Sequence, residues 1–167
     1  MLFDFTYWMR DRILERAARL ASTEFTAPSG VTTRNLRGTL VHTLDVEFSW
    51  RARLRGEPEA VWKKELAVGD YPTVGSLAEH WRRDEVEMRA WLAALDDAEL
   101  AREFALDPAG SVASGERYPL WYYVLHVHTH SHQQLADAAV LLTRMRQSPG
   151  NLEFLDFADH LHGRARA

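Results

Sequence analysis

The chain has 167 residues, 46% of them hydrophobic, and a formal net charge of -4. This length suits a substantial core, and we expect a single domain over residues 1–167. The acidic balance argues against a general nucleic-acid-binding surface. Because the sequence has no cysteine, disulfides, thiolate catalysis and cysteine-ligated metal are excluded, and any metal must use histidine, carboxylate, amide or water ligands.

The N-terminal residues do not resemble a targeting segment. The stretch MLFDFTYWMRDR has Asp4 inside its apolar run and no basic region ahead of it, unlike a signal peptide. No uncharged apolar run approaches about 18 residues, the length that indicates a membrane span. We therefore expect a cytoplasmic protein that does not bind membranes.

Two long helices are predicted in the first third of the chain. Residues 2–21 place apolar side chains at helical spacing on one face. Residues 22–31 are rich in Ser, Thr, Pro and Gly, which predicts a loop. A second helix is predicted from about Thr33 to Arg55, where Gly56, Glu57 and Pro58 stop it. The following connection, 57–72, has no clear pattern.

Two more long helices are predicted in the remainder. One runs from about residue 73 or 76 to 95, and another from near Pro119 to just before Ser148. Between them, residues 98–118 are the least helical part and predict a short hairpin. The tail, 151–167, predicts a short packed helix before a basic end. Four amphipathic helices of roughly 20 residues indicate an all-α four-helix bundle, with the order of its helices left open.

The last long helix carries four histidines, at 126, 128, 130 and 132. Residues two apart on a helix differ by roughly 200° in direction, whereas residues four apart share a face. His126 and His130 therefore form one pair, and His128 and His132 a nearly opposite one. A helical His-x-x-x-His pair is a good metal chelate. The alternative is that these are surface or packed imidazoles, and His128 and His132, closer to the apolar arc, fit packing better.

The second helix offers a partner for such a pair. His42 lies almost opposite the centre of its apolar stripe, so a site built with it would open to solvent. That arrangement suits a metal that keeps a position free for water or substrate. Glu47 instead falls within the apolar stripe, and a buried carboxylate needs a partner. We prefer a structural bond to a neighbouring helix over a catalytic role for Glu47.

Several stretches together resemble a known family. They are LFDFTYWMRDRIL, LRGTLVHTLDVEFSWRARLRGE, DYPT and PLWYYVLHVHTHSHQQLADAAVLLTRMRQSPGNLE. Over nearly the whole chain they are similar to the DinB-like (DNA-damage-inducible, YfiT-like) family of metalloenzymes. The most specific parts are His–x4–Glu–x2–Trp, here His42, Glu47 and Trp50, and the histidine helix. The resemblance implies an up-down-down-up four-helix bundle, often dimeric, and a role in the stress response.

The resemblance also implies a metal site of three histidines, holding zinc or nickel, with one ligand from the second helix and two from the last. His42 matches the first ligand and His130 the second, while Gln134 stands where the third histidine is expected. The neutral amide of glutamine suits calcium or magnesium better than zinc. Three outcomes are open: His126, at a position that is often histidine in the family, takes the vacant corner; Gln134 coordinates weakly or through water; or the site is degenerate and empty.

Characterised relatives include thiol-dependent transferases, so the resemblance implies a metal-dependent transferase or hydrolase that forms a homodimer. Its small-molecule substrate is unknown, with a low-molecular-weight thiol as one candidate. The metal would lower the pKa of a bound water or thiol, and Glu47 or Asp137 would orient a ligand histidine. The alternative is a non-catalytic dimeric protein with a decayed metal site. Nucleic-acid binding, suggested only by the family's name, conflicts with the acidic balance and the lack of a basic stripe.

Overall fold

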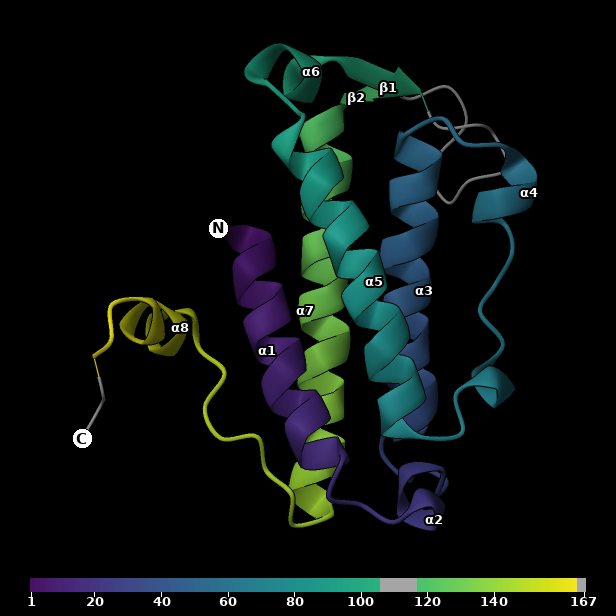
Figure 1. Ribbon diagram of the computed structural model, residues 1–167, viewed down its shortest axis with the longest axis vertical. Coiled ribbons are helices and arrows are strands. Elements are labelled where there is room, and N and C mark those ends of the chain that lie inside the picture. The colour runs from purple at the N-terminus through teal and green to yellow at the C-terminus, as the bar shows by residue number, and fades with distance from the viewer. Residues whose placement is uncertain (106–116, 165–167) are drawn as a thin grey trace.

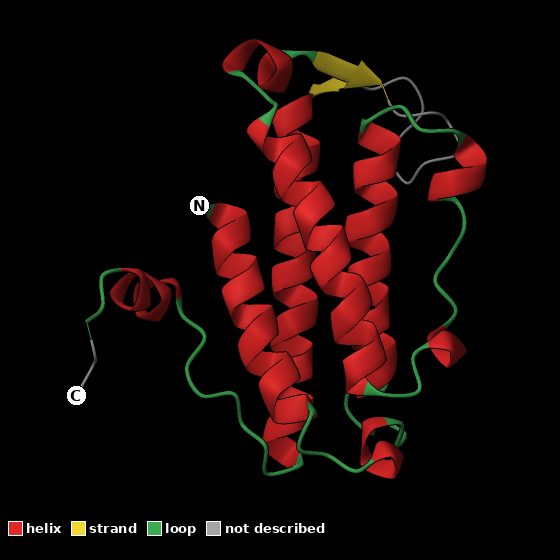
Figure 2. Ribbon diagram, viewed as in Figure 1, coloured by secondary structure: helices red, strands yellow, loops and turns green. Residues whose placement is uncertain are grey.

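In the computed structural model, which describes residues 1–105 and 117–164, four long helices lie side by side (Figure 1). They are α1 (Leu2–Ala17), α3 (Leu36–Leu54), α5 (Val74–Ala93) and α7 (Leu120–Arg144). Helix dominates the described residues, as the sequence predicts (Figure 2). None of the helices in this part of the chain is both long and apolar enough to cross a membrane.

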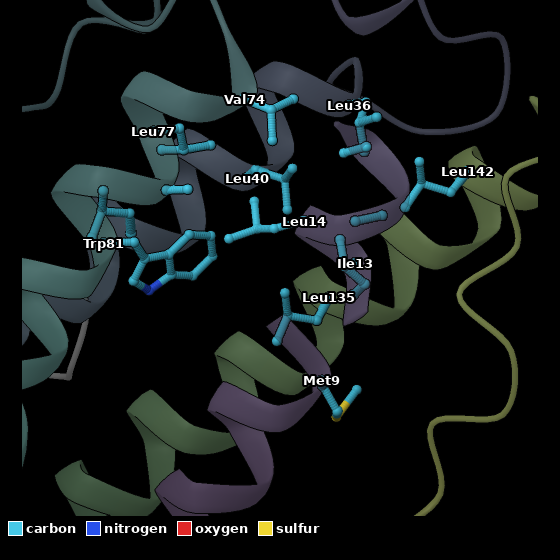
Figure 3. Packing of buried hydrophobic residues seen from close by; sticks show 14 of the residues in the cluster. Met9, Ile13, Leu14, Leu36, Leu40, Val74, Leu77, Trp81, Leu135 and Leu142 are labelled. Carbon is cyan, nitrogen blue, oxygen red and sulfur yellow. The ribbon is translucent and has the colours of Figure 1, made fainter. Parts of the chain in front are cut away.

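Each long helix packs against two others. α7 makes extensive contacts with both α3 and α1, and α5 contacts α3 and α1 from the other side. The interior is filled by apolar side chains from all four helices, with the Trp81 ring fully buried among them. Figure 3 shows part of this packing, with side chains of α1, α3, α5 and α7 converging on one core. The labelled members are Met9, Ile13, Leu14, Leu36, Leu40, Val74, Leu77, Trp81, Leu135 and Leu142.

Capping residues explain where the helices begin. Asn35 precedes α3, and its side-chain oxygen accepts a hydrogen bond from the Gly38 N–H at 2.8 Å. Thr73 does the same for α5, accepting from the Ser76 N–H at 3.2 Å. Such caps satisfy N–H groups that lack a partner in the first turn. α3 stops before Gly56, whose φ of 76° lies in the left-handed region that favours glycine.

Short helices occupy segments where the sequence predicts a loop or no structure. The loop predicted over 22–31 is wrong at its start, because α2 (Ser22–Phe25) forms there and buries the Phe25 ring. The Glu24 carboxylate supports this turn by accepting from the Ala21 N–H at 2.8 Å. The connection 57–72 contains α4 (Glu59–Trp62) and the 3₁₀ helix η1 (Val68–Asp70).

The predicted hairpin is confirmed in its two arms. After α6 (Asp97–Ala101), β1 (Glu103–Ala105) pairs antiparallel with β2 (Arg117–Pro119). The turn between the arms falls in residues 106–116, outside the described residues. Both strands lie at the end of the bundle where α7 begins (Figure 1).

The predicted packed helix of the tail is also present, as α8 (Phe154–Leu161). Its Phe157 ring is buried and contacts the rings of Phe5 and Trp8 on α1. The last residues of the predicted basic end, 165–167, lie outside the described part of the chain.

Candidate metal centre

His42 and His130 meet between α3 and α7. Their ring centroids are 5.2 Å apart and the rings are inclined by 74°. A zinc ion lies about 2.0–2.1 Å from an imidazole nitrogen, hence roughly 3.2 Å from the ring centroid, so two imidazoles at a tetrahedral angle have centroids roughly 5.2 Å apart. The observed separation therefore fits two imidazoles that share one metal ion.

The environment of His130 favours the neutral form that a metal requires. Burial lowers the pKa of His130 to about 4, and the charges of His42, His126 and Arg34 act in the same direction. Its Nδ1 atom is buried and has no hydrogen-bond partner among the described residues. A neutral imidazole offers a lone pair to a metal without first losing a proton. His130 is thus suited, in charge and in position, to be a ligand.

His126 lies one turn before His130 but turns toward another neighbour. Its ring packs edge-on against Trp50, with centroids 4.9 Å apart, and is 6.3 Å from the His130 ring. Burial lowers the pKa of His126. Among residues 1–105 and 117–164, no three His, Cys, Asp or Glu side chains are grouped so that they could hold a metal ion. In this arrangement, His126 does not complete a three-histidine set.

Gln134 lies one turn after His130 on the same face of α7 and is half-buried. Gln134 stands at the position of the third ligand that the resemblance implies, and its amide oxygen is the atom that would coordinate the metal there. That oxygen is hard and weakly basic, so it would strengthen a two-histidine site only modestly for zinc or nickel. Asp137, the other carboxylate considered near the site, lies half-buried three residues further along.

Glu47 has the structural role that the sequence analysis prefers. It is fully buried, and one carboxylate oxygen accepts from the Trp81 indole N–H while the other accepts from the Ser131 hydroxyl, both at 2.8 Å. These bonds join α3 to α5 and to α7. The Glu47 oxygens are thus bonded to Trp81 and Ser131 rather than to a ligand histidine. Since Ser131 follows His130 directly, the bond also fixes the rotation of α7 that brings His130 to His42.

The other histidine pair faces α1, and the packing role predicted for it is confirmed for His128. The His128 ring is buried and shares a hydrogen bond of 2.9 Å between its Nδ1 and the Thr6 hydroxyl. His132 is exposed, with its ring 5.5 Å from that of Phe5. Neither side chain lies on the face of α7 that carries His130 and meets His42.

A cavity of about 500 Å³ opens beside His42. Arg34, Asp45 and Glu65 supply charges to its wall. Burial lowers the pKa of His42 and the Arg34 charge lowers it further, whereas Asp45 and Glu65 oppose this. The sequence does not indicate Arg34 or Glu65 as site residues, because Arg34 directly precedes the Asn35 cap of α3 and Glu65 lies in a connection without periodicity.

Comparison with known proteins supports one assignment. Among curated protein sequences, no match to the chain is found. The family model described as the DinB family matches residues 1–161 of the 167. That match covers every described helix, including the two that carry His42 and His130. The chain therefore belongs to the DinB family.

Proposed function

We propose that this protein binds a divalent metal ion, zinc or nickel, between α3 and α7, with His42 and His130 as its imidazole ligands. Gln134 serves as a weaker third donor, and His126 could replace it if its side chain turned away from Trp50. The observation that carries the proposal is the 5.2 Å separation of the His42 and His130 rings. The buried, unpartnered Nδ1 of His130 supports it.

The reaction we propose is transfer or hydrolysis on a small molecule, with a low-molecular-weight thiol as a candidate reactant. A bound divalent ion supplies Lewis acidity, which lowers the pKa of a water or thiol held by it. The chain's own residues hold and orient the two imidazoles, and Glu47 keeps α3 and α7 in register through Ser131. The cavity beside His42 admits the reactant.

We also infer that the long helices follow the up-down-down-up order that the family resemblance implies. α3 and α7 run in opposite directions, since His42 contacts His130 while Trp50 contacts Tyr123. Between α1 and the α7 segment, and between α3 and α5, a contact made further along one helix meets a residue further along the other. This pattern supports a parallel arrangement of each pair. These contacts are Phe3 with His128, Arg12 with Pro149, Glu47 with Trp81, and Arg51 with Asp84. A homodimer is part of the same proposal, and light scattering would give its mass.

A second candidate function is that of a non-catalytic protein with a decayed site. The observation that favours it is the presence of only two convergent imidazoles within the described residues, with Gln134 at the third corner. This alternative predicts that added metal has no effect on the protein. It also predicts that His130→Ala changes the free energy of unfolding only by about 0.5–3 kcal/mol, as for an ordinary side chain.

The test is metal uptake by four forms of the purified chain: the wild type, His42→Ala, Gln134→His and His132→Ala. Each is incubated with zinc or nickel, desalted and subjected to elemental analysis. We expect about one equivalent in the wild type and in His132→Ala, the control on the α1-facing side, and loss of metal in His42→Ala. Gln134→His completes a three-imidazole set and should tighten binding by roughly tenfold or more.

Thermal melting gives an independent reading of the same forms. A metal that binds only the folded state must raise the melting temperature of the forms that bind it. Retention of metal by His42→Ala at the wild-type level would contradict the proposal. Metal uptake by Gln134→His alone, with none by the wild type, would identify the decayed site instead.

A further inference from the structure

The cavity beside His42 is of the size that small-molecule sites have. Its volume is about 500 Å³, within the range of roughly 300–1,000 Å³ typical of ligand pockets. One wall is α3 with the two residues before it, and the other is formed by Glu65 and Leu66, which precede η1, and by Val68, its first residue. The Asp45 carboxylate accepts a hydrogen bond from the Leu66 N–H at 2.8 Å, which ties this segment to α3.

The charges on the cavity wall are separated by sign. Arg34 lies just before α3 begins, whereas Asp45 lies near the middle of the helix and Glu65 beside it. At 1.5 Å per residue, the ten residues from the Asn35 cap to Asp45 span roughly 15 Å along the helix. His42 lies between the two ends and faces the same cavity.

The charged groups at the two ends are available to a ligand. Arg34 and Glu65 are both exposed, and no ion pair joins either of them to another residue in the described part of the chain. The Arg34 charge reaches the candidate metal centre, since it lowers the pKa of both His42 and His130. Between the ends, the wall is apolar at Val41, Leu66 and Val68.

We infer that this cavity binds a short zwitterionic peptide, with its carboxylate at Arg34 and its ammonium group at Glu65 and Asp45. A simple anion would use only Arg34, and a dianion would be repelled by the two carboxylates. The middle of such a ligand lies beside His42. The inference rests on the proposed function only in placing the reacting group near the metal, because the binding itself needs no metal.

The inference is tested with metal-free protein and three matched peptides. Trialanine carries both charges, its C-terminal amide lacks the carboxylate, and N-acetyl-trialanine lacks the ammonium group; an extended tripeptide spans roughly 10 Å, which fits between the charged ends. Nuclear magnetic resonance titration gives each affinity. We expect trialanine to bind roughly tenfold more tightly than either capped peptide, as charge-assisted hydrogen bonds are the strong ones.

Substitutions assign each charge to its partner. Arg34→Ala should bind trialanine and its amide equally, and Glu65→Gln should bind trialanine and N-acetyl-trialanine equally. Arg82→Ala, which removes an exposed arginine on α5 away from this cavity, should leave all three affinities unchanged. Equal affinity for the three peptides in the wild type, no binding of trialanine at millimolar concentration, or an equal effect of Arg82→Ala would each overturn the inference.

The metal-binding function and the zwitterion site can each be overturned without the other. Loss of metal uptake with retained discrimination among the peptides would overturn the metal function and leave the zwitterion site intact. Metal uptake without discrimination would overturn the zwitterion site alone.

Discussion

At the scale of single residues, Glu47 shows how a carboxylate is accommodated inside an apolar bundle. Its two partners, Trp81 and Ser131, are neutral donors rather than cations. Neutral donors satisfy the oxygens but compensate only in part for the loss of water around a charge. Burial therefore dominates and raises the pKa of Glu47 to about 7.

This raised pKa makes the stability depend on pH with a definite sign. Between about pH 4.5, where the unfolded chain releases the proton, and about pH 7, the folded state holds one proton more. The free energy of unfolding should therefore fall as pH rises through this window, by an amount on the order of 3 kcal/mol from Glu47. Glu47→Gln keeps the shape and removes the titration, so its urea-unfolding free energy should lose this slope between pH 5 and 7.

Other groups near Glu47 also titrate. The difference in pH slope between the wild type and Glu47→Gln therefore gives the contribution of Glu47 alone. Asp84 is also buried with a raised pKa, and it is present in both forms. An identical pH slope for the wild type and Glu47→Gln would show that Glu47 ionises as readily in the folded state as in the unfolded chain.

Helical spacing alone pairs His126 with His130 and places His42 away from the apolar stripe of its own helix. That His42 and His130 belong together could be predicted only from the family resemblance, and their rings lie side by side in the structure. The packing of His126 against Trp50 could not, because it depends on the rotation of a side chain about its own bonds. Arg34 and Glu65 could not either, because Arg34 stands at the start of the predicted second helix, ahead of its apolar stripe, and Glu65 lies in a connection without periodicity.

At the scale of the elements, the long helices follow closely from the sequence and the short ones do not. α5 and α7 have many turns over which an apolar face repeats, and each has a clear start signal. α2 and α4 have four residues each, too few for any periodicity. Such helices form because tertiary contacts hold them, as the buried ring of Phe25 does for α2.

The start of α3 matters because it precedes both His42 and the cavity. The Asn35 side chain caps Gly38 N–H and also donates to the Thr26 carbonyl at 2.8 Å. Asn35→Ala should lower the free energy of unfolding by about 1–2 kcal/mol, measured in urea, since it removes the cap and the tie to the preceding loop. Asn35→Asp keeps the oxygen that caps the Gly38 N–H and loses the bond to the Thr26 carbonyl, so it should lower the free energy of unfolding by less than Asn35→Ala does. Equal losses in the two variants would show that the tie to Thr26, not the cap, provides the stabilisation.

At the scale of the whole molecule, α5 is joined to the bundle by buried ion pairs as well as by apolar packing. Arg51 on α3 pairs with Asp84, and Arg10 on α1 pairs with Glu85 at 2.6 Å. Arg10, Arg51 and Asp84 are all buried. Sequence patterns do not predict these pairs, because the charged residues of α5 look like an ordinary solvated face until the neighbouring helices are in place.

The Arg51–Asp84 pair leads to a prediction about the bundle as a unit. Asp84→Ala leaves the Arg51 guanidinium buried without its carboxylate, and breaking a buried pair in this way costs about 3–5 kcal/mol. Removing both charges, as in Arg51→Met with Asp84→Leu, should recover most of that loss, because no charge is then left buried. Glu79→Ala breaks the exposed pair with Arg83 and should cost less than about 1 kcal/mol.

Urea unfolding of these variants measures the costs, and metal uptake shows how far the effect extends. Because His42 and His130 lie on α3 and α7, whereas Asp84 lies on α5, the Asp84→Ala protein should still take up metal below its melting temperature. A loss in Asp84→Ala no larger than that in Glu79→Ala would show that water reaches Arg51 and that the pair is not a buried tie. Loss of metal uptake in a folded Asp84→Ala protein would show instead that α5 is needed to hold the facing surfaces of α3 and α7 in register.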